Sequence, residues 1–197
     1  MNQEKLAEVI SKILSPVSIA FYVITIITFF SPIKQSYQNT FISFILALFF
    51  LVFFPMMFIL YYFKRGKIDL WVSDRKIRTP FYIIAIIGYI ISISIFYQIK
   101  NYDMLILSLA YFFVTTVVML TNLITKVSSH SAGVAGPLTA ITFMFGYFSS
   151  VSFILVIIVI WARLKMKAHN LLQLVSGVVI SIIITFLVYY FSYNYFT

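Results

Sequence analysis

Acidic residues are few in this chain of 197 residues, and cysteine is absent. The acidic residues number five: Glu4, Glu8, Asp69, Asp74 and Asp103. None of them lies in the middle of an apolar run. An aspartyl intramembrane protease, a carboxylate-dependent metal enzyme and a carboxylate-coupled ion transporter all need acidic side chains there, so the sequence excludes these classes. Without cysteine, disulfides and thiol chemistry are excluded as well.

Charged residues of both signs are scarce, at 10% of the chain against 62% hydrophobic residues. A helix that crosses a bilayer takes about 20 apolar residues. Uncharged runs of about this length cover residues 13–33, 41–63, 81–99 and 104–125. The stretch 127–162 suits two short spans with a turn at 147–150, and a last run covers 171–197. The sequence predicts an all-α integral membrane protein with six or seven transmembrane helices in a single domain, residues 1–197.

Residues 1–14 are predicted to form an amphipathic helix at the membrane interface. Leu6, Val9, Ile10, Ile13 and Leu14 fall on one helical face. The run that follows lacks the small-residue pattern of a signal-peptide cleavage site, so we expect it to remain as the first span.

Polar residues gather in three patches, at 64–80, 125–131 and 161–173. Two predicted spans separate the first patch from the second, and two more separate the second from the third. An even number of crossings returns the chain to the same side of the membrane. The three patches are therefore expected to meet at one face.

The distribution of positive charge suggests which face this is. If the N-terminus lies on the same side as the patches, only Lys34 and Lys100 of the 14 lysines and arginines lie on the opposite side. The positive-inside rule then places the patches in the cytoplasm. Because the cations are confined to helix ends and no basic domain exists, the net charge of +9 does not indicate a nucleic-acid partner.

The remaining reactive side chains are suited to phosphate chemistry without a metal. Both histidines, His130 and His169, stand beside cations at the ends of predicted spans. One neutral imidazole can attack phosphorus while a second, protonated imidazole supplies a proton to the leaving oxygen. Arginine binds phosphate oxygens in bidentate fashion. Gln173 follows His169 by four residues, so in a helix it can accept a hydrogen bond from one ring nitrogen.

The motifs resemble those of the type 2 phosphatidic acid phosphatase superfamily, which carries K-x6-R-P, P-S-G-H and S-R-x5-H-x3-D in this order. This chain has R-x5-H-x3-Q in "RLKMKAHNLLQ" and S-x-H in "SSH", with a lysine before it. It departs from the family at Trp71, which stands where the first-motif lysine is expected, and at Gln173, which replaces the aspartate. The resemblance implies a six-helix core of that family.

The resemblance also implies roles for individual residues. His169 would be the nucleophile, His130 the general acid, and Gln173 the residue that orients His169. The residues assigned to the phosphate are Arg163, Arg78, Ser128, Lys126, Arg75 and Asp74. Lys67, Arg75 and Lys126 are alternatives for the missing lysine. No metal or other cofactor is implied.

The function expected from these residues is hydrolysis of a lipid phosphate or diphosphate in the bilayer. Polyprenyl diphosphate is the preferred substrate, because the four candidate cations Arg75, Arg78, Lys126 and Arg163 exceed what one phosphate requires. Phosphatidic acid and phosphatidylglycerol phosphate remain alternatives. Two other classes also stay open: a non-enzymatic protein that binds or flips phospholipids, and a purely structural membrane subunit.

Overall fold

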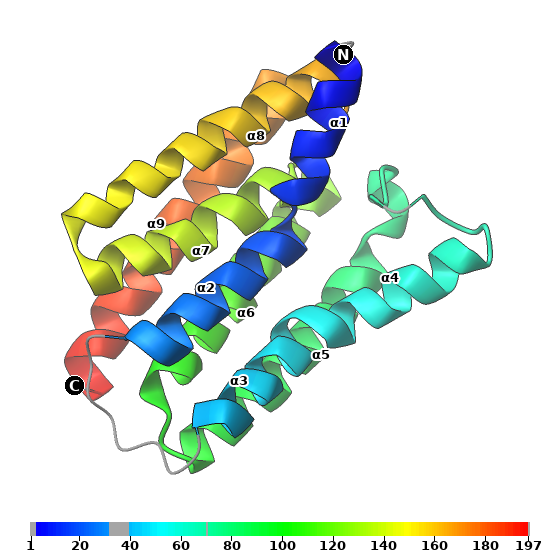
Figure 1. Cartoon of the computed structure of the whole chain (residues 1–197). Helices are drawn as coiled ribbons and strands as arrows, with labels where there is room; N and C mark the ends of the chain where they lie inside the picture. Colours follow the sequence, from blue (N-terminus) through cyan, green and yellow to red (C-terminus); the bar gives the residue numbers. More distant parts are fainter. Residues whose placement is uncertain (1–2, 32–39, 70, 197) are drawn as a thin grey trace.

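The computed structural model describes residues 3–31, 40–69 and 71–196, and these residues fold into helices that run side by side along one bundle (Figure 1). The elements are α1 (Gln3–Ile13), α2 (Pro16–Phe30), α3 (Thr40–Leu48), the π-helical turn η1 (Phe49–Phe53), α4 (Phe54–Lys64), the 3-10 turn η2 (Arg75–Ile77), α5 (Thr79–Gln98), α6 (Tyr102–Ile124), α7 (Ser129–Phe145), the 3-10 turn η3 (Tyr147–Phe153), α8 (Ile154–Lys165) and α9 (Leu171–Phe196).

The prediction of a helical membrane protein is confirmed. Among the described residues, six helical segments are long and apolar enough to cross a bilayer: Gln3–Phe30, Thr40–Lys64, Thr79–Gln98, Tyr102–Ile124, Tyr147–Lys165 and Leu171–Ser192. Helix α7 runs among them as a further pass. The first described residues and the end of α9 consequently lie at opposite ends of the bundle (Figure 1).

Helix α7 is short because it shares residues 127–162 with α8. Its 17 residues extend about 25 Å, less than the ~30 Å of a hydrocarbon core. The predicted turn at 147–150 is present as η3, which leads directly into α8. Most of α7 is buried, since it packs against both α9 and α2. The first turn of α7 lies beside the first turn of α9, since the backbone N–H of Ser128 donates to Gln173 O at 3.0 Å.

Small residues allow this close packing. A Cβ atom added to Gly133 of α7 would lie 2.8 Å from Pro16 Cβ of α2. A Cβ atom added to Gly177 of α9 would lie 2.5 Å from the carbonyl oxygen of Ser128. Such distances leave no space for a methyl group, so the backbones of α7 and α9 approach each other where α7 begins.

The amphipathic helix predicted at the N-terminus is α1, but it contacts the protein through a face that the sequence pattern did not indicate. Ala7 and Ser11 are fully buried, whereas Val9 and Ile13 of the apolar face are exposed. The helix packs against α8, while Val9 and Ile13 point outward, where a bilayer interface would cover them. Ser15 then caps α2, and Pro16 stands in its first turn.

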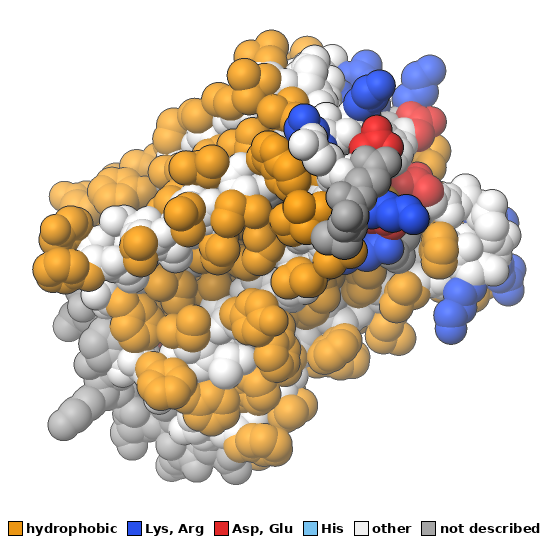
Figure 2. All heavy atoms as spheres, turned by 45° about the horizontal axis from the view of Figure 1, so that its top comes forward, with side chains coloured by type: hydrophobic (Ala, Val, Ile, Leu, Met, Phe, Trp, Pro, Cys, Tyr) orange, Lys and Arg blue, Asp and Glu red, His pale blue; other side chains and the backbone are white. Residues whose placement is uncertain are grey.

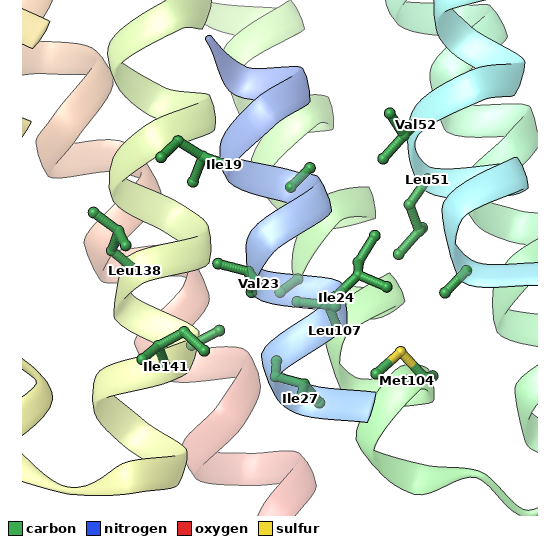
Figure 3. Close-up of a cluster of buried hydrophobic side chains, with 14 of the residues drawn as sticks. Ile19, Val23, Ile24, Ile27, Leu51, Val52, Met104, Leu107, Leu138 and Ile141 are labelled. Carbon is green, nitrogen blue, oxygen red and sulfur yellow. The ribbon is translucent and has the colours of Figure 1, made fainter. Parts of the chain in front are cut away.

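The apolar core fills the half of the bundle that lies away from α1 (Figure 3). Ile19, Val23, Ile24 and Ile27 of α2 face Leu107 of α6 and Leu138 and Ile141 of α7. Leu51 and Val52 of η1 reach the same cluster. The π-helical turn ends two residues before Pro55, which has no N–H to donate into a regular α-helical ladder.

Charged side chains gather at the other end of the bundle, around α1 and the segment between α4 and α5 (Figure 2). Lys100 lies at the opposite end, after α5. Lys34, which was assigned to that end with it, lies outside the described residues. We name the end that carries α1 the cationic end.

Candidate active site

The three polar patches meet at the cationic end, as their order along the chain predicts. Arg78 Nη1 donates to Val127 O at 3.1 Å, which joins the first patch to the second. The backbone N–H of Ser128 donates to Gln173 O at 3.0 Å, which joins the second patch to the third. Segments nearly 100 residues apart along the chain thus form one site.

His169 precedes α9 and is oriented by Gln173. Its Nδ1 lies 3.1 Å from Gln173 Oε1, and because an amide oxygen only accepts, Nδ1 carries the proton. Asn170 and Gln173 hold each other in a reciprocal N-terminal cap, with Gln173 N donating to Asn170 Oδ1 at 2.9 Å and Asn170 N donating to Gln173 Oε1 at 3.4 Å. In the neutral ring, Nε2 then keeps a free lone pair.

The electrostatic surroundings favour this neutral ring. Burial lowers the pKa of His169 from 6.5 to about 4, against the hydrogen bond with Gln173, and the charges of Arg163, Lys126 and Arg78 lower it further. At neutral pH the imidazole is therefore uncharged and able to act as a nucleophile.

His130 lies in the first turn of α7 and is 7% exposed. Its Nε2 lies 3.1 Å from the carbonyl oxygen of Ser11 in α1, so Nε2 is the protonated nitrogen. The ring of Trp71 packs edge-on against it, with 5.3 Å between ring centroids. Ser128 caps α7, since its Oγ accepts from Ser131 N at 3.2 Å. This cap fixes the helix start on which His130 stands.

Arg163 stands in the last turn of α8 and is 4% exposed. Its Nη1 donates to Ser11 Oγ at 3.3 Å, and its guanidinium carbon lies 5.5 Å from the centre of the Trp71 ring. Its Nε is buried and has no hydrogen-bond partner among the described residues. A buried guanidinium with donors to spare is suited to binding an anion.

Arg78 is buried as well, but carbonyl oxygens already occupy much of its donor capacity. Nε donates to Val72 O at 2.7 Å, Nη1 to Val127 O, and Nη2 to Ser73 O at 3.3 Å. Val72 has φ +46°, an uncommon conformation for a β-branched residue. The strained backbone at Val72, directly after Trp71, turns the carbonyl group of Val72 toward Arg78. Arg78 therefore fastens the loop as well as facing the site.

The other residues assigned to phosphate lie differently. Arg75 Nη1 donates to Ile124 O at 2.8 Å, so its guanidinium caps the C-terminal end of α6. Asp74 caps η2 by accepting from Lys76 N at 2.9 Å. Lys126 Nζ donates to Ala168 O at 3.4 Å beside His169, and burial with the nearby Arg78 and Arg163 lowers its pKa. Ser128 is fully buried and is used in the cap and backbone contacts.

A cavity of about 460 Å³ extends from this cluster into the bundle. Its polar end is lined by Lys12, Trp71, Arg78, His130, Arg163 and His169. From there it is bounded mainly by apolar side chains of α4, α5, α6 and α7, such as Met56, Ile59, Phe81, Leu107, Val118 and Ala140. Pro16 and Val17 of α2 form part of the wall on the side of α1.

Sequence reasoning missed several residues at the polar end. Ser11 and Lys12 come from α1, which had been assigned to the interface only. Ser129, and not Ser128, lines the cavity, and its Oγ lies 2.6 Å from the Tyr82 hydroxyl. Trp71 contacts both His130 and Arg163. The only advance signal for Trp71 was its place in the first motif, and nothing in the sequence distinguished Ser11.

Metal ligands are not grouped at this site. Across the described parts of the chain, no three His, Cys, Asp or Glu side chains come together in a geometry that could hold an ion. The polar end therefore offers imidazole and guanidinium groups to a ligand, an arrangement that can neutralise a phosphate group and place a nucleophile and an acid beside it.

Comparison of the chain with family models, curated proteins and solved structures gives no match. The site is therefore interpreted from its own geometry.

Proposed function

We propose that this protein is a membrane-embedded, metal-independent phosphatase that acts on a lipid phosphate or diphosphate. The observation that carries the proposal is the combination of two buried histidines and two buried arginines at the polar end of an otherwise apolar cavity. An anionic headgroup and a hydrocarbon tail match the two parts of this cavity. The motif resemblance to the type 2 phosphatidic acid phosphatase superfamily leads to the same chemistry.

In the proposed reaction, the free Nε2 of His169 attacks phosphorus, and the bond between phosphorus and the leaving oxygen breaks. His130, in its imidazolium form, donates the Nδ1 proton to that oxygen, while its Nε2–H stays bonded to Ser11 O. Water then attacks the phosphohistidine, its proton passes to His130, the P–N bond breaks, and inorganic phosphate is released. Arg163 and Arg78 stabilise the charge on the non-bridging oxygens. The Gln173 contact to Nδ1 keeps the nucleophilic nitrogen directed at the cavity.

Polyprenyl diphosphate is the proposed substrate. The α7 residues that border the cavity run from His130 to Ala140, a separation of ten residues that corresponds to a depth of about 15 Å. This is about half of a ~30 Å hydrocarbon core, so a tail can follow the cavity within its own leaflet. One cavity suits one isoprenoid chain better than the paired acyl chains of phosphatidic acid. Arg78, Arg163 and Lys12 line the polar end, and Lys126 lies beside His169, enough cations for two phosphates.

A protein that binds phospholipid without hydrolysing it is the second candidate. Gln173 favours it, because a neutral amide does not stabilise the positive imidazolium that a phosphohistidine intermediate produces, and Arg163, Arg78 and Lys126 oppose that charge. Binding alone requires only the cations.

The deciding experiment measures phosphate release by the purified protein in detergent with EDTA present. Farnesyl diphosphate and phosphatidic acid are compared, each with wild type, His169→Ala and Leu172→Ala. We expect phosphate release to fall at least about 1,000-fold in His169→Ala. Leu172→Ala should keep most of the release, because the Leu172 side chain is 77% exposed and does not line the cavity. Release that survives His169→Ala contradicts the mechanism. No release from either lipid, with binding intact, favours the second candidate.

A further inference from the structure

The last turn of α1 reaches the candidate active site from outside the three polar patches. Ser11 is fully buried. Its carbonyl oxygen accepts a hydrogen bond from His130 Nε2 at 3.1 Å, and its hydroxyl accepts one from Arg163 Nη1 at 3.3 Å. A single residue of α1 thus contacts both the candidate general acid and the candidate phosphate-binding arginine.

Lys12, the next residue, lines the same cavity. Its Nζ lies 2.7 Å from Glu8 Oε1, one turn earlier on α1, and both side chains are about half exposed. An exposed ion pair of this kind contributes little stability. A phosphate group at the polar end can therefore replace Glu8 as the ion-pair partner of Lys12 with little loss of stability.

The site has a place for such a cation. Trp71 occupies the position at which the motif pattern has lysine, and its ring packs against Arg163 and His130. Three N–H groups of Arg78 already donate to carbonyl oxygens. Arg75 donates to the carbonyl oxygen of Ile124 at the end of α6. Arg163 Nε remains buried without a hydrogen-bond partner in the described structure. Arg163 and Lys12 thus join Arg78 as cavity-lining cations that keep donors for an incoming anion.

We propose that the last turn of α1 completes the phosphate site: the Lys12 ammonium binds a phosphate oxygen of the substrate, and Ser11 positions His130 and Arg163. The identity of the ligand as a lipid phosphate rests on the function proposed above. The role of α1 goes beyond that function, because the binding residue Lys12 and the positioning residue Ser11 belong to a helix that lies outside all three motifs.

Lys12 is tested against Lys5, a matched lysine on the same helix that does not line the cavity. Lys12→Gln and Lys5→Gln change net charge equally. The probe is inorganic phosphate, with binding followed by Trp71 fluorescence in a Trp161→Phe background, beside the KM and kcat for farnesyl diphosphate. We expect Lys12→Gln to raise both Kd and KM about tenfold, the loss of one charge-assisted hydrogen bond, and Lys5→Gln to leave both within about twofold.

Ser11 is tested by the division between kcat and KM. Ser11→Ala removes the hydroxyl and keeps the carbonyl. Because Arg163 loses the Ser11 hydroxyl as a hydrogen-bond acceptor and no substrate contact is removed, we expect kcat to fall about tenfold with KM little changed. Ser11→Thr restores a hydroxyl and should recover part of kcat. The melting temperature of each variant is measured as well. A general loss of folding would lower the melting temperatures of Ser11→Ala and Ser11→Thr alike, whereas a loss of positioning would leave them unchanged.

The outcomes separate this inference from the proposed function. Equal effects of Lys12→Gln and Lys5→Gln on phosphate binding overturn the role of Lys12, whether or not the protein hydrolyses lipid. If phosphate binding depends on Lys12 but the protein hydrolyses no lipid, the role of Lys12 is supported and the proposed phosphatase function is contradicted. A wild-type protein that neither binds phosphate nor releases it overturns both.

Discussion

At the cationic end of the bundle, loops and helix starts are joined by side-chain hydrogen bonds to backbone carbonyl oxygens, whereas at the other end the helices meet through apolar side chains. Arg78 and Arg75 each reach a carbonyl oxygen near the junction of α6 and α7. In contrast, Ile24, Ile27 and Met104 pack together at the other end (Figure 3). The first end holds several positive charges close to one another, whereas Lys100 stands apart from these charges at the second end.

This difference indicates a division between stability and function. Arg163, Arg78 and Lys126 lie near His169, and like charges in a buried site repel. Such an arrangement lowers stability unless an anion binds, so it is expected where a ligand is bound and not where a fold is held together. The apolar end has no comparable conflict. The predictions below test this division.

The largest effect is expected at Arg163. Arg163→Met removes a buried charge and keeps a side chain of similar length. Because one phosphate-binding group is lost, kcat/KM for the lipid diphosphate should fall at least about 100-fold. The melting temperature should stay the same or rise, since a repelling charge is gone. Activity assays and thermal unfolding of the same preparation check both parts. A large fall in melting temperature would show that Arg163 mainly holds the fold.

The opposite result is expected from Ile24→Ala in the apolar end, at a residue that does not line the cavity. Ile24 is fully buried, and removal of a buried isoleucine side chain costs about 2–5 kcal/mol. The melting temperature should fall clearly, while kcat at a temperature where the protein stays folded changes by less than about threefold. Loss of kcat without loss of stability would contradict the division between the two ends.

A third test concerns the close contact between α7 and α9 at the cationic end. In Gly177→Ala the new methyl group would meet the carbonyl oxygen of Ser128 at 2.5 Å. We expect a loss of about 1–3 kcal/mol from this overpacking, together with reduced activity because α9 carries the segment that holds His169. Gly136→Ala is the milder control, since its nearest contact is Thr185 Oγ1 at 3.3 Å.

A smaller effect is expected from pH. His169 has a pKa of about 4 in the folded protein instead of 6.5, so the unfolded chain binds more protons between these values. The free energy of unfolding should therefore fall as pH decreases from about 6.5 to about 4. His169→Gln should show a weaker fall in the same window. Melting temperatures measured in steps from pH 7.5 to pH 4.5 provide the comparison, and parallel curves for the two proteins would contradict it.

The smallest effect is expected from Ser73→Cys, which labels the cationic end. Ser73 is exposed, and the chain has no other cysteine. Activity should be unchanged within about twofold. In intact cells an impermeant maleimide should leave this cysteine unmodified and label it after the membrane is opened, because the positive-inside rule predicts that this end faces the cytoplasm. Labelling in intact cells would reverse the assignment.

Much of the fold was predictable from the sequence because a bilayer limits the choices. Uncharged runs of sufficient length become helices, and the parity of the crossings brings the three patches to one face. The hydrogen bond between His169 and Gln173 also followed from their spacing of four residues and is present. These features depend on the spacing of nearby residues or on the number of predicted membrane crossings, and the sequence alone provides both.

The contacts of α1 were not predictable in the same way. Ser11 and Lys12 have no motif around them, and the apolar pattern directed attention to the opposite face of the helix. Likewise, Arg75 and Arg78 are three residues apart and chemically alike, yet Arg78 lines the cavity and Arg75 closes α6. Which arginine reaches a site depends on the path of a loop, and the sequence does not encode that path locally.

The sequence by itself determined that the chain spans a membrane, that its polar groups meet at one end, and that histidine and arginine are the reactive groups available. The tertiary structure decided which of these groups border the cavity and that α1 and Trp71 join them. The physical reason is the range of the forces involved. Hydrophobic burial and helix periodicity act over a few residues, while the site depends on hydrogen bonds between segments as far apart as Ser11 and Arg163.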